Sequence, residues 1–184
     1  IASNPARIRG AAHPGSKHRT SIPEPVVLDQ LAAALPEHLS VAVTLAAWGG
    51  LRWGEMVELR RRDIDLDRRI VRVQRARTRA AGGTAVKEPK SAAGHRDVVM
   101  PASSIKALGR HLDDHVGRFP DSPLFPSAGR GAHLAYASWS REWQKARMAV
   151  GRPDLKFHDL RHTCGTYVAA MGGTVRDVQQ RLGH

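Results

Sequence analysis

The spacing of apolar residues changes twice along this chain, and these changes limit what it can fold into. Apolar residues recur every three or four positions over residues 27–35, 39–48 and 53–59, as in amphipathic helices. Between residues 64 and 99 this spacing gives way to short β-branched runs separated by turn sequences, and after residue 101 the helical spacing returns. The pattern predicts an α+β fold that is mostly helical, with a small three-stranded antiparallel sheet.

The expected strands and later helices can be located from the same pattern. The strands are predicted within residues 64–73, 84–86 and 98–99, with turn sequences at 67–69, 81–83 and 92–94. The later helices are predicted at residues 102–116, 135–150, 160–171 and 175–182, with Thr174 as N-cap of the last one. His111 and His115 stand four residues apart on the first of these helices, between polar neighbours, and we expect both to be solvated.

The length and charge of the chain limit the number of domains and the kind of partner that it can have. The 184 residues are enough for one domain, and residues 1–25, rich in Pro and turn dipeptides, are predicted to be a linker arm before a globular part at 26–184. Twenty-nine Lys and Arg against 17 Asp and Glu give a net charge of +12, which favours a polyanionic partner. The sequence has one cysteine, Cys164, and neither a membrane-spanning apolar run nor a signal segment, so we expect a cytoplasmic protein.

The first candidate functional segment is residues 50–55, with the sequence GLRWGE. Arg52 stands there between apolar residues and glycines at a predicted helix start, where a guanidinium is costly to desolvate unless it meets an anion or a carboxylate. One interpretation is that Arg52 binds an anion. The other is that it pairs with Glu55 or reaches solvent.

Lys90 is the second candidate, on a predicted hairpin of sequence EPKSAAGHRD. A lysine at a hairpin tip is commonly a solvated charge. A hairpin also fits a DNA groove, and an ammonium group there can protonate a leaving oxygen, which a guanidinium does poorly because its pKa is above ~12.

Two further segments lie near the end of the chain. Residues 156–163 read KFHDLRHT, in which His158 and Arg161 would share one side of a helix start and form a phosphate site. The alternatives are a helix cap with a surface arginine, or a metal site formed by His158 and His162 at i, i+4. Residues 181–184 read RLGH, in which a glycine would end the last helix before His184.

Taken in this order, the four segments resemble the motifs of the tyrosine recombinase (phage integrase) family. The resemblance implies a catalytic domain in which Arg52 and Arg161 stabilise charge on a scissile phosphate and Glu55 orients the first motif. It also implies that Lys90 protonates the leaving 5′-oxygen, His158 assists proton transfer at a nucleophilic tyrosine, and His184 donates to a phosphate oxygen. Neither a cofactor nor a metal is implied, since arginine and lysine supply the positive charge.

In that family the nucleophilic tyrosine follows the LGH motif by about one short helix. Tyr136 precedes the HxxR motif, and Tyr167 lies among apolar residues of a helix, so we expect neither to be the nucleophile. We therefore expect residues 26–184 to be a catalytic domain truncated before its nucleophile. Residues 1–25 would be the linker from an N-terminal core-binding domain that this sequence does not contain.

The implied function is site-specific DNA strand cleavage and rejoining through a 3′-phosphotyrosyl intermediate, by a phage- or prophage-encoded enzyme in a bacterial cytoplasm. The implied partner is double-stranded DNA, bound by a homotetramer when the protein is intact, while the isolated fragment would be an inactive monomer. The residues expected to contact DNA phosphates are Arg60, Arg61, Arg62, Arg72, Arg75, Arg77, Arg79, Lys87 and Arg96.

Other functions fit parts of the same pattern. A non-catalytic DNA-binding protein that retains the fold is the main alternative, and a metallohydrolase built on His158 and His162 is another. A type IB topoisomerase, a telomere resolvase or an invertase would share much of the chemistry.

Overall fold

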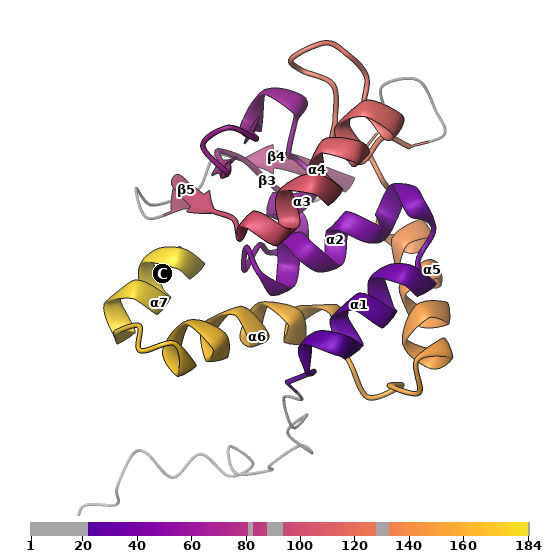
Figure 1. Ribbon diagram of the computed structural model, residues 1–184. Helices are drawn as coiled ribbons and strands as arrows, with labels where there is room; N and C mark the ends of the chain where they lie inside the picture. The colour runs from indigo at the N-terminus through magenta and orange to yellow at the C-terminus, as the bar shows by residue number, and fades with distance from the viewer. Residues whose placement is uncertain (1–21, 81–82, 88–93, 128–132, 184) are drawn as a thin grey trace, which may run out of the picture.

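The computed structural model describes residues 22–80, 83–87, 94–127 and 133–183 as a helical body with two small antiparallel sheets (Figure 1). The helices are α1 (Pro25–Ala34), α2 (Glu37–Ala47), α3 (Trp53–Met56), the 3₁₀ turn η1 (Arg61–Asp63), α4 (Ala102–His115), α5 (Tyr136–Ala149), α6 (Phe157–Ala170) and α7 (Val175–Leu182). The strands are β1 (Ile64–Asp65), β2 (Ile70–Val73), β3 (Ala76–Ala80), β4 (Gly83–Lys87) and β5 (Arg96–Val99). The predicted α+β class is confirmed.

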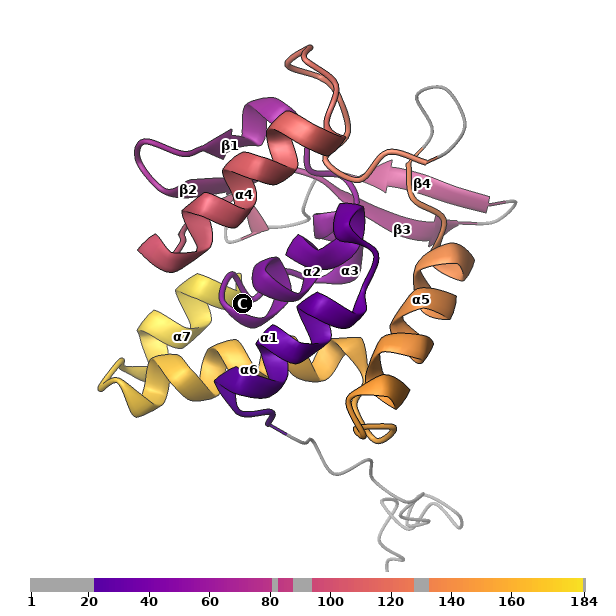
Figure 2. The same cartoon turned by 45° about the vertical axis from the view of Figure 1, so that its right-hand side comes forward.

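Helix α2 forms the centre of the core. Its sequence, EHLSVAVTLAA, is apolar on nearly every side, and seven of its 11 residues are buried. A helix of this kind needs apolar neighbours all round, and α2 packs against α1, α3, α4 and α6. In Figures 1 and 2 it lies between these helices, with α5 on the far side of α1. The body therefore holds α3 and α6, which carry the first and third candidate segments, against one common helix.

The strand region forms two sheets (Figure 2). The three-stranded sheet has the order β1-β2-β5, and Val71 pairs with Val98 at its centre. Within residues 64–73, β1 and β2 are separated by a turn that includes Arg69, whose φ is +59°, and this turn falls in the predicted turn sequence at 67–69. The predicted strand at 84–86 does not join this sheet. It pairs with residues 76–80 as a separate β3-β4 hairpin. The sequence did not predict β3 because ARTRA contains no large apolar residue.

The predicted helices agree with the structure to within a few residues, with two differences. The helix predicted at 53–59 is shorter than expected, because the chain leaves the helix after Met56 and the Leu59 carbonyl accepts the Leu124 amide instead. Helix α6 begins at Phe157, three residues earlier than predicted. Thr174 is the N-cap of α7 as predicted, and its hydroxyl accepts the Asp177 amide at 3.2 Å.

The expectation that His111 is solvated is wrong. Its side chain faces the core, the residue is 3% exposed, and its Nε2 lies 2.8 Å from the Leu124 carbonyl. Burial lowers the pKa of His111, so the ring is predominantly neutral near pH 7. The burial of His111 was not predicted because its sequence neighbours are polar, and a histidine can bury its ring while its helix neighbours remain exposed.

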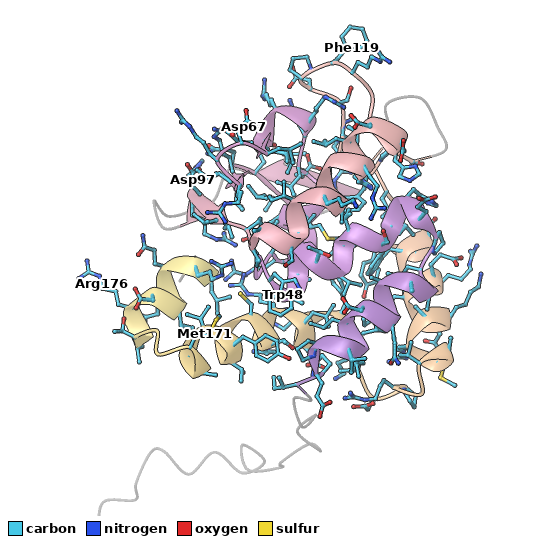
Figure 3. The ribbon with its side chains drawn as sticks, in the orientation of Figure 1. Trp48, Asp67, Asp97, Phe119, Met171 and Arg176 are labelled. Carbon is cyan, nitrogen blue, oxygen red and sulfur yellow. The ribbon has the colours of Figure 1, made fainter. Side chains whose placement is uncertain are left out.

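None of the helices in the described ranges is long and apolar enough to cross a lipid bilayer. The large exposed apolar side chains are few and scattered. They include Phe119 on the loop after α4 and Met171 at the end of α6, both labelled in Figure 3. The same view places Trp48 at the junction of α2 and α6, where its ring stacks on Tyr167 at 5.3 Å.

Candidate active site

Two glycines hold the first candidate segment tightly against its surroundings. Gly50 has a φ of +67°, and a Cβ there would lie 2.7 Å from a methyl carbon of Leu182. A Cβ on Gly54 would lie 2.2 Å from the Arg77 carbonyl oxygen. The glycines therefore allow the turn before α3 to contact α7 on one side and β3 on the other, and Arg52 lies between them at the N-cap of α3.

Glu55 is the acceptor around which the site is organised. Its carboxylate accepts both the Arg52 backbone N–H and the Arg52 guanidinium at 2.9 Å. It also accepts two hydrogen bonds from Arg96, at 2.9 and 3.2 Å, and lies 3.9 Å from Arg161. Burial acts to raise the pKa of Glu55, but the hydrogen bonds from Arg96 and Arg52 outweigh it and hold the pKa below its usual value. Glu55 is therefore an ionised group within the protein.

The position of Arg96 differs from the expectation that this residue contacts DNA. It points inward from β5 and is 8% exposed, and besides Glu55 it binds the Arg181 carbonyl through Nε at 3.0 Å. A guanidinium with these partners inside the protein does not form part of a DNA-binding surface. The sequence did carry a signal for this position, because Arg96 and Val98 alternate with Asp97 and Val99 and so share the inner face of the strand.

Arg161 connects the candidate motifs. It is 3% exposed, and its guanidinium donates to the Gly50 carbonyl of the first motif and to the Leu182 carbonyl at the end of α7. Burial, followed by the charge of Arg52, lowers its pKa to about 10. Arg161 is thus protonated at neutral pH, and it holds the HxxR helix against the two other motifs.

Arg181 is a residue that the sequence analysis did not single out. Its guanidinium donates to the Trp48 carbonyl at the end of α2 and to the Val99 carbonyl of β5. Its Nε also lies 3.3 Å from Sγ of the buried Cys164. Carbonyls at a helix end lack partners within the helix, so Arg181 stabilises α2 while it holds α7 in place.

His158 lies beside the arginines, in the first turn of α6. The residue is exposed at the surface, but partial desolvation of its ring is the largest cause that lowers its pKa, followed by the charges of His162, Arg161 and Arg52. The His158 and His162 rings are perpendicular, with centroids 4.9 Å apart. Among the described residues no group of three His, Cys, Asp or Glu side chains converges as metal ligands do, so this histidine pair has no third protein ligand there.

The charges in this cluster do not balance. Arg52, Arg96 and Arg161 contribute three positive charges and Glu55 one negative charge, which leaves +2. The Arg52 side chain is 41% exposed, so one guanidinium is open to a ligand from solvent. A site with excess positive charge, one accessible guanidinium and a neutral imidazole is suited to bind a phosphate and to exchange protons with it.

Lys90 and His184 fall outside the described residues. β4 ends at Lys87 and β5 begins at Arg96, on either side of the segment that contains Lys90. Gly183, just before His184, ends α7 in the left-handed conformation with a φ of +67°, as expected for a glycine at a helix end.

The remaining arginines expected to contact DNA lie on the surface formed by η1 and the strands, and most pair with carboxylates. Arg60 and Arg62 both contact Asp121, and Arg72 contacts Asp65 at 2.6 Å. The others bind groups that are largely buried: Arg61 donates to the Leu112 carbonyl, Arg75 pairs with Asp63, and Arg77 pairs with Glu58. Arg79 and Lys87 lie on β3 and β4, but the structure does not describe their side chains.

Neither tyrosine lies in the arginine cluster. The Tyr167 hydroxyl donates to the Pro23 carbonyl at 2.8 Å. Tyr136 begins α5, is 59% exposed, and packs edge-on against Trp53 at 5.5 Å.

This combination of fold and site defines a known class of protein. The phage integrase family matches residues 25–184, and the chain belongs to that family. It is 44% identical to a prophage phiRv2 integrase of Mycobacterium tuberculosis strain H37Rv, and 33% identical to the integrase of Mycobacterium phage D29. Each alignment covers 100% of this chain, but 49% and 50% of the respective relatives. The chain therefore spans about half the length of the curated relatives that it matches.

Solved structures show the same fold. The Tn1549 transposon integrase in complex with circular intermediate DNA superposes with a TM-score of 0.75 over 90% of this chain and 59% of that chain, at 18% identity. The XerA recombinase superposes with a TM-score of 0.71 over 91% of this chain and 56% of that chain, at 26% identity. The mostly helical arrangement with a small antiparallel sheet is thus that of tyrosine recombinase catalytic domains.

Proposed function

We propose that this chain is the catalytic part of a site-specific DNA recombinase, which cleaves and rejoins DNA through a 3′-phosphotyrosyl intermediate. The observation that carries the proposal is the convergence of Arg52 and Arg161 on Glu55, with excess positive charge and with His158 close enough to both arginines for their charges to lower its pKa. A phosphodiester gains negative charge in its transition state, and fixed cations stabilise that charge without reorganising. The nucleophile in this proposal is a tyrosine outside these 184 residues.

The proposed reaction has a cleavage step and a rejoining step that is its reverse. The tyrosine oxygen attacks the scissile phosphorus and forms a phosphotyrosyl bond, while the bond to the 5′-oxygen breaks. His158 has a lowered pKa, so it is neutral at pH 7 and can accept the tyrosine proton. Lys90 donates a proton to the departing 5′-oxygen, and His184 donates to a non-bridging oxygen. Attack by a 5′-hydroxyl reverses the sequence, and the covalent link conserves the bond energy, so ATP is not needed.

Arg52 and Arg161 have different parts in this proposal. Arg52 is accessible, and Glu55 fixes its guanidinium, so it can contact the phosphate directly. Arg161 uses two of its N–H donors on main-chain carbonyls and is almost completely buried, so a direct contact with phosphate would have to come from its remaining N–H groups. Until DNA binds, Arg161 stabilises the arrangement of the motifs.

The proposed partner is double-stranded DNA, held in the intact protein by a homotetramer in a bacterial cytoplasm. Arg60, Arg62 and Arg72 remain the candidates for phosphate contacts around the site, since each is at least a quarter exposed and pairs with a carboxylate that is itself partly exposed. The isolated chain is expected to be a monomer, and sedimentation would test this. A stable tetramer without DNA would contradict the expectation.

Covalent trapping tests the proposed function. The full-length protein is incubated with a nicked duplex that carries its own recombination site, so that the cleaved strand end is lost and the protein–DNA link accumulates. We expect an adduct that resists denaturant and disappears when the downstream tyrosine is changed to phenylalanine. Arg161→Ala should also abolish it, with folding checked by circular dichroism.

A non-catalytic DNA-binding protein is the second candidate. It is favoured by one observation, the 3% exposure of Arg161 and its engagement with two carbonyls. In that case the full-length protein would bind its site with strong salt dependence but form no adduct.

A further inference from the structure

The C-terminal end of α7 supplies hydrogen-bond acceptors to two of the arginines around Glu55. Arg96 donates through Nε to the Arg181 carbonyl at 3.0 Å, and Arg161 donates to the Leu182 carbonyl. The last carbonyls of a helix have no partner within the helix and carry the negative end of its dipole. These two carbonyls therefore bind buried guanidiniums that otherwise share a single carboxylate, that of Glu55.

The side chain of Arg181 fixes this end of α7 to the rest of the domain. Its guanidinium donates to the Trp48 carbonyl, through Nη2 at 2.6 Å and Nε at 3.2 Å, and to the Val99 carbonyl at 3.0 Å. Trp48 is the C-cap of α2, the helix at the centre of the core, and Val99 ends the strand β5. Leu182 is the one buried residue of α7. A helix that buries so little of its own surface depends on such contacts for its position.

The side chain and the main chain of Arg181 both bind β5. The side chain contacts Val99, and the carbonyl accepts from Arg96 at the start of the same strand. A movement of α7 away from β5 would break both contacts and would also take the Leu182 carbonyl away from Arg161. The position of α7 therefore determines which acceptors the two buried arginines have.

We propose that Arg181 is a positioning residue for strand cleavage, which keeps α7 where its end carbonyls hold Arg96 and Arg161 in the active arrangement. The inference rests on the proposed function for the reaction itself. Arg181 acts through the other arginines and does not contact DNA. Misplacement of a catalytic group by about 1 Å can slow a reaction about 100-fold, so loss of the Arg181 contacts should lower the cleavage rate more than the affinity for DNA.

The test measures covalent trapping by the full-length protein at saturating DNA. Arg181→Met keeps much of the apolar length of the side chain and removes its donors, and it should slow adduct formation at least about tenfold. Arg181→Lys returns a charged donor without the planar fork that reaches two carbonyls, so it should recover part of the lost rate.

Two control variants separate positioning from charge and from helix stability. Arg176→Met removes the same charge from an exposed position of α7 that points away from the body (Figure 3), so it should keep the wild-type rate and match the DNA affinity of Arg181→Met. Thr174→Ala removes the hydroxyl that caps the opposite end of α7, and it should lower the melting temperature by about 2–4 °C. The end carbonyls keep their partners in this variant, so its rate should stay within about twofold of wild type.

A second measurement does not need cleavage. The Nε–H group of Arg96 donates to the Arg181 carbonyl, and its hydrogen exchange can be followed by ¹H–¹⁵N NMR in the 184-residue chain. Loss of this hydrogen bond should make the exchange at least about fivefold faster in Arg181→Met than in Thr174→Ala.

Three results would overturn the proposal. They are an adduct rate at the wild-type level in Arg181→Met, an equal loss of rate in Thr174→Ala, and equal Nε–H exchange of Arg96 in the two variants. Absence of an adduct in the wild type would count against the proposed function instead, and the exchange rates alone would then decide whether Arg181 positions the buried arginines.

Discussion

The arginines around Glu55 and the arginines on the sheet surface are used in different ways. In the first region three guanidiniums surround one carboxylate, and two of them, those of Arg96 and Arg161, are almost completely buried. In the second region the partners are more evenly matched, as in the pair of Arg72 with Asp65. Net charge therefore concentrates at the first region although both are rich in arginine. The location of unbalanced charge, which the overall +12 does not reveal, marks the candidate active site.

The two regions should also differ in how much each ion pair contributes to stability. Exposed pairs contribute about 0–1 kcal/mol, since water and salt screen them. Removing one partner of a buried pair costs about 3–5 kcal/mol, because the remaining charge stays in a low-dielectric environment. Substitutions in the two regions can test this difference.

The largest effect is expected for Glu55→Gln. The change leaves Arg96 and Arg161 buried without their shared countercharge and removes the acceptor that fixes Arg52. We expect the free energy of unfolding to fall by about 3–5 kcal/mol, measured by urea denaturation. Asp121→Asn, which removes an exposed partner of Arg60 and Arg62, is the control and should leave the urea midpoint nearly unchanged. Equal losses in the two variants would remove the distinction between the regions.

A smaller loss is expected for Gly54→Ala. The new methyl group would lie 2.2 Å from the Arg77 carbonyl oxygen, and no side-chain rotation can move this backbone atom away. Overpacking of this kind costs about 1–3 kcal/mol. Gly109→Ala in α4 is the matched control, because among the described residues outside its own helix turn the methyl group would meet a Leu66 methyl at an ordinary 3.6 Å, and a helical alanine should stabilise by about 0.5–1 kcal/mol. Thermal denaturation of both variants would show shifts of opposite sign.

The pH dependence of stability gives a further test of how the Glu55 region differs from the sheet surface. The folded-state pKa of Glu55 lies below its ordinary value of 4.5, so its contribution is fully present above about pH 4.5 and is lost as the pH falls through the folded-state pKa. The stability difference between the wild type and Glu55→Gln should therefore shrink on acidification. Urea midpoints from about pH 6 to about pH 3 would show this. A difference that stays constant would mean that Glu55 has an ordinary pKa.

The smallest effect on stability is expected for Arg72→Met. Its side chain is 33% exposed and its pair with Asp65 lies at the surface, so the free energy of unfolding should change by no more than about 1 kcal/mol. The effect on DNA binding should be clearer. Loss of one phosphate contact would reduce the slope of log K against log salt by about 0.9. An unchanged slope would show that Arg72 does not contact DNA.

The sequence predicted those parts of the fold that depend on local patterns. The α+β class, the seven helices and the Thr174 cap follow from apolar spacing and capping chemistry. The β3-β4 hairpin was assigned wrongly because ARTRA has no apolar face of its own, and its pairing is decided by the neighbouring strand. His111 was misjudged for a related reason, since its burial depends on a loop distant in the sequence.

The sequence predicted which motifs form the site but not how their side chains are arranged in space. Arg52, Glu55, His158 and Arg161 were selected from the sequence, and the structure brings them together. The inward position of Arg96 was missed although the alternation along β5 indicated it. The carbonyl contacts of Arg181 were missed because a guanidinium that binds inside the protein resembles, in the sequence, one that binds DNA, and only long-range contacts distinguish the two uses of Arg181.

The most direct test of the division between the two regions is the rate of covalent adduct formation by the full-length protein at saturating DNA, compared for Arg52→Ala and Arg72→Ala. We predict that Arg52→Ala slows the reaction by about 100-fold or more, with little change in DNA affinity, because its guanidinium stabilises the transition state. Arg72→Ala should weaken binding but leave the rate at saturation unchanged. Equal rate losses in both variants, or an unimpaired rate in Arg52→Ala, would contradict the assignment of the Glu55 cluster as the active site.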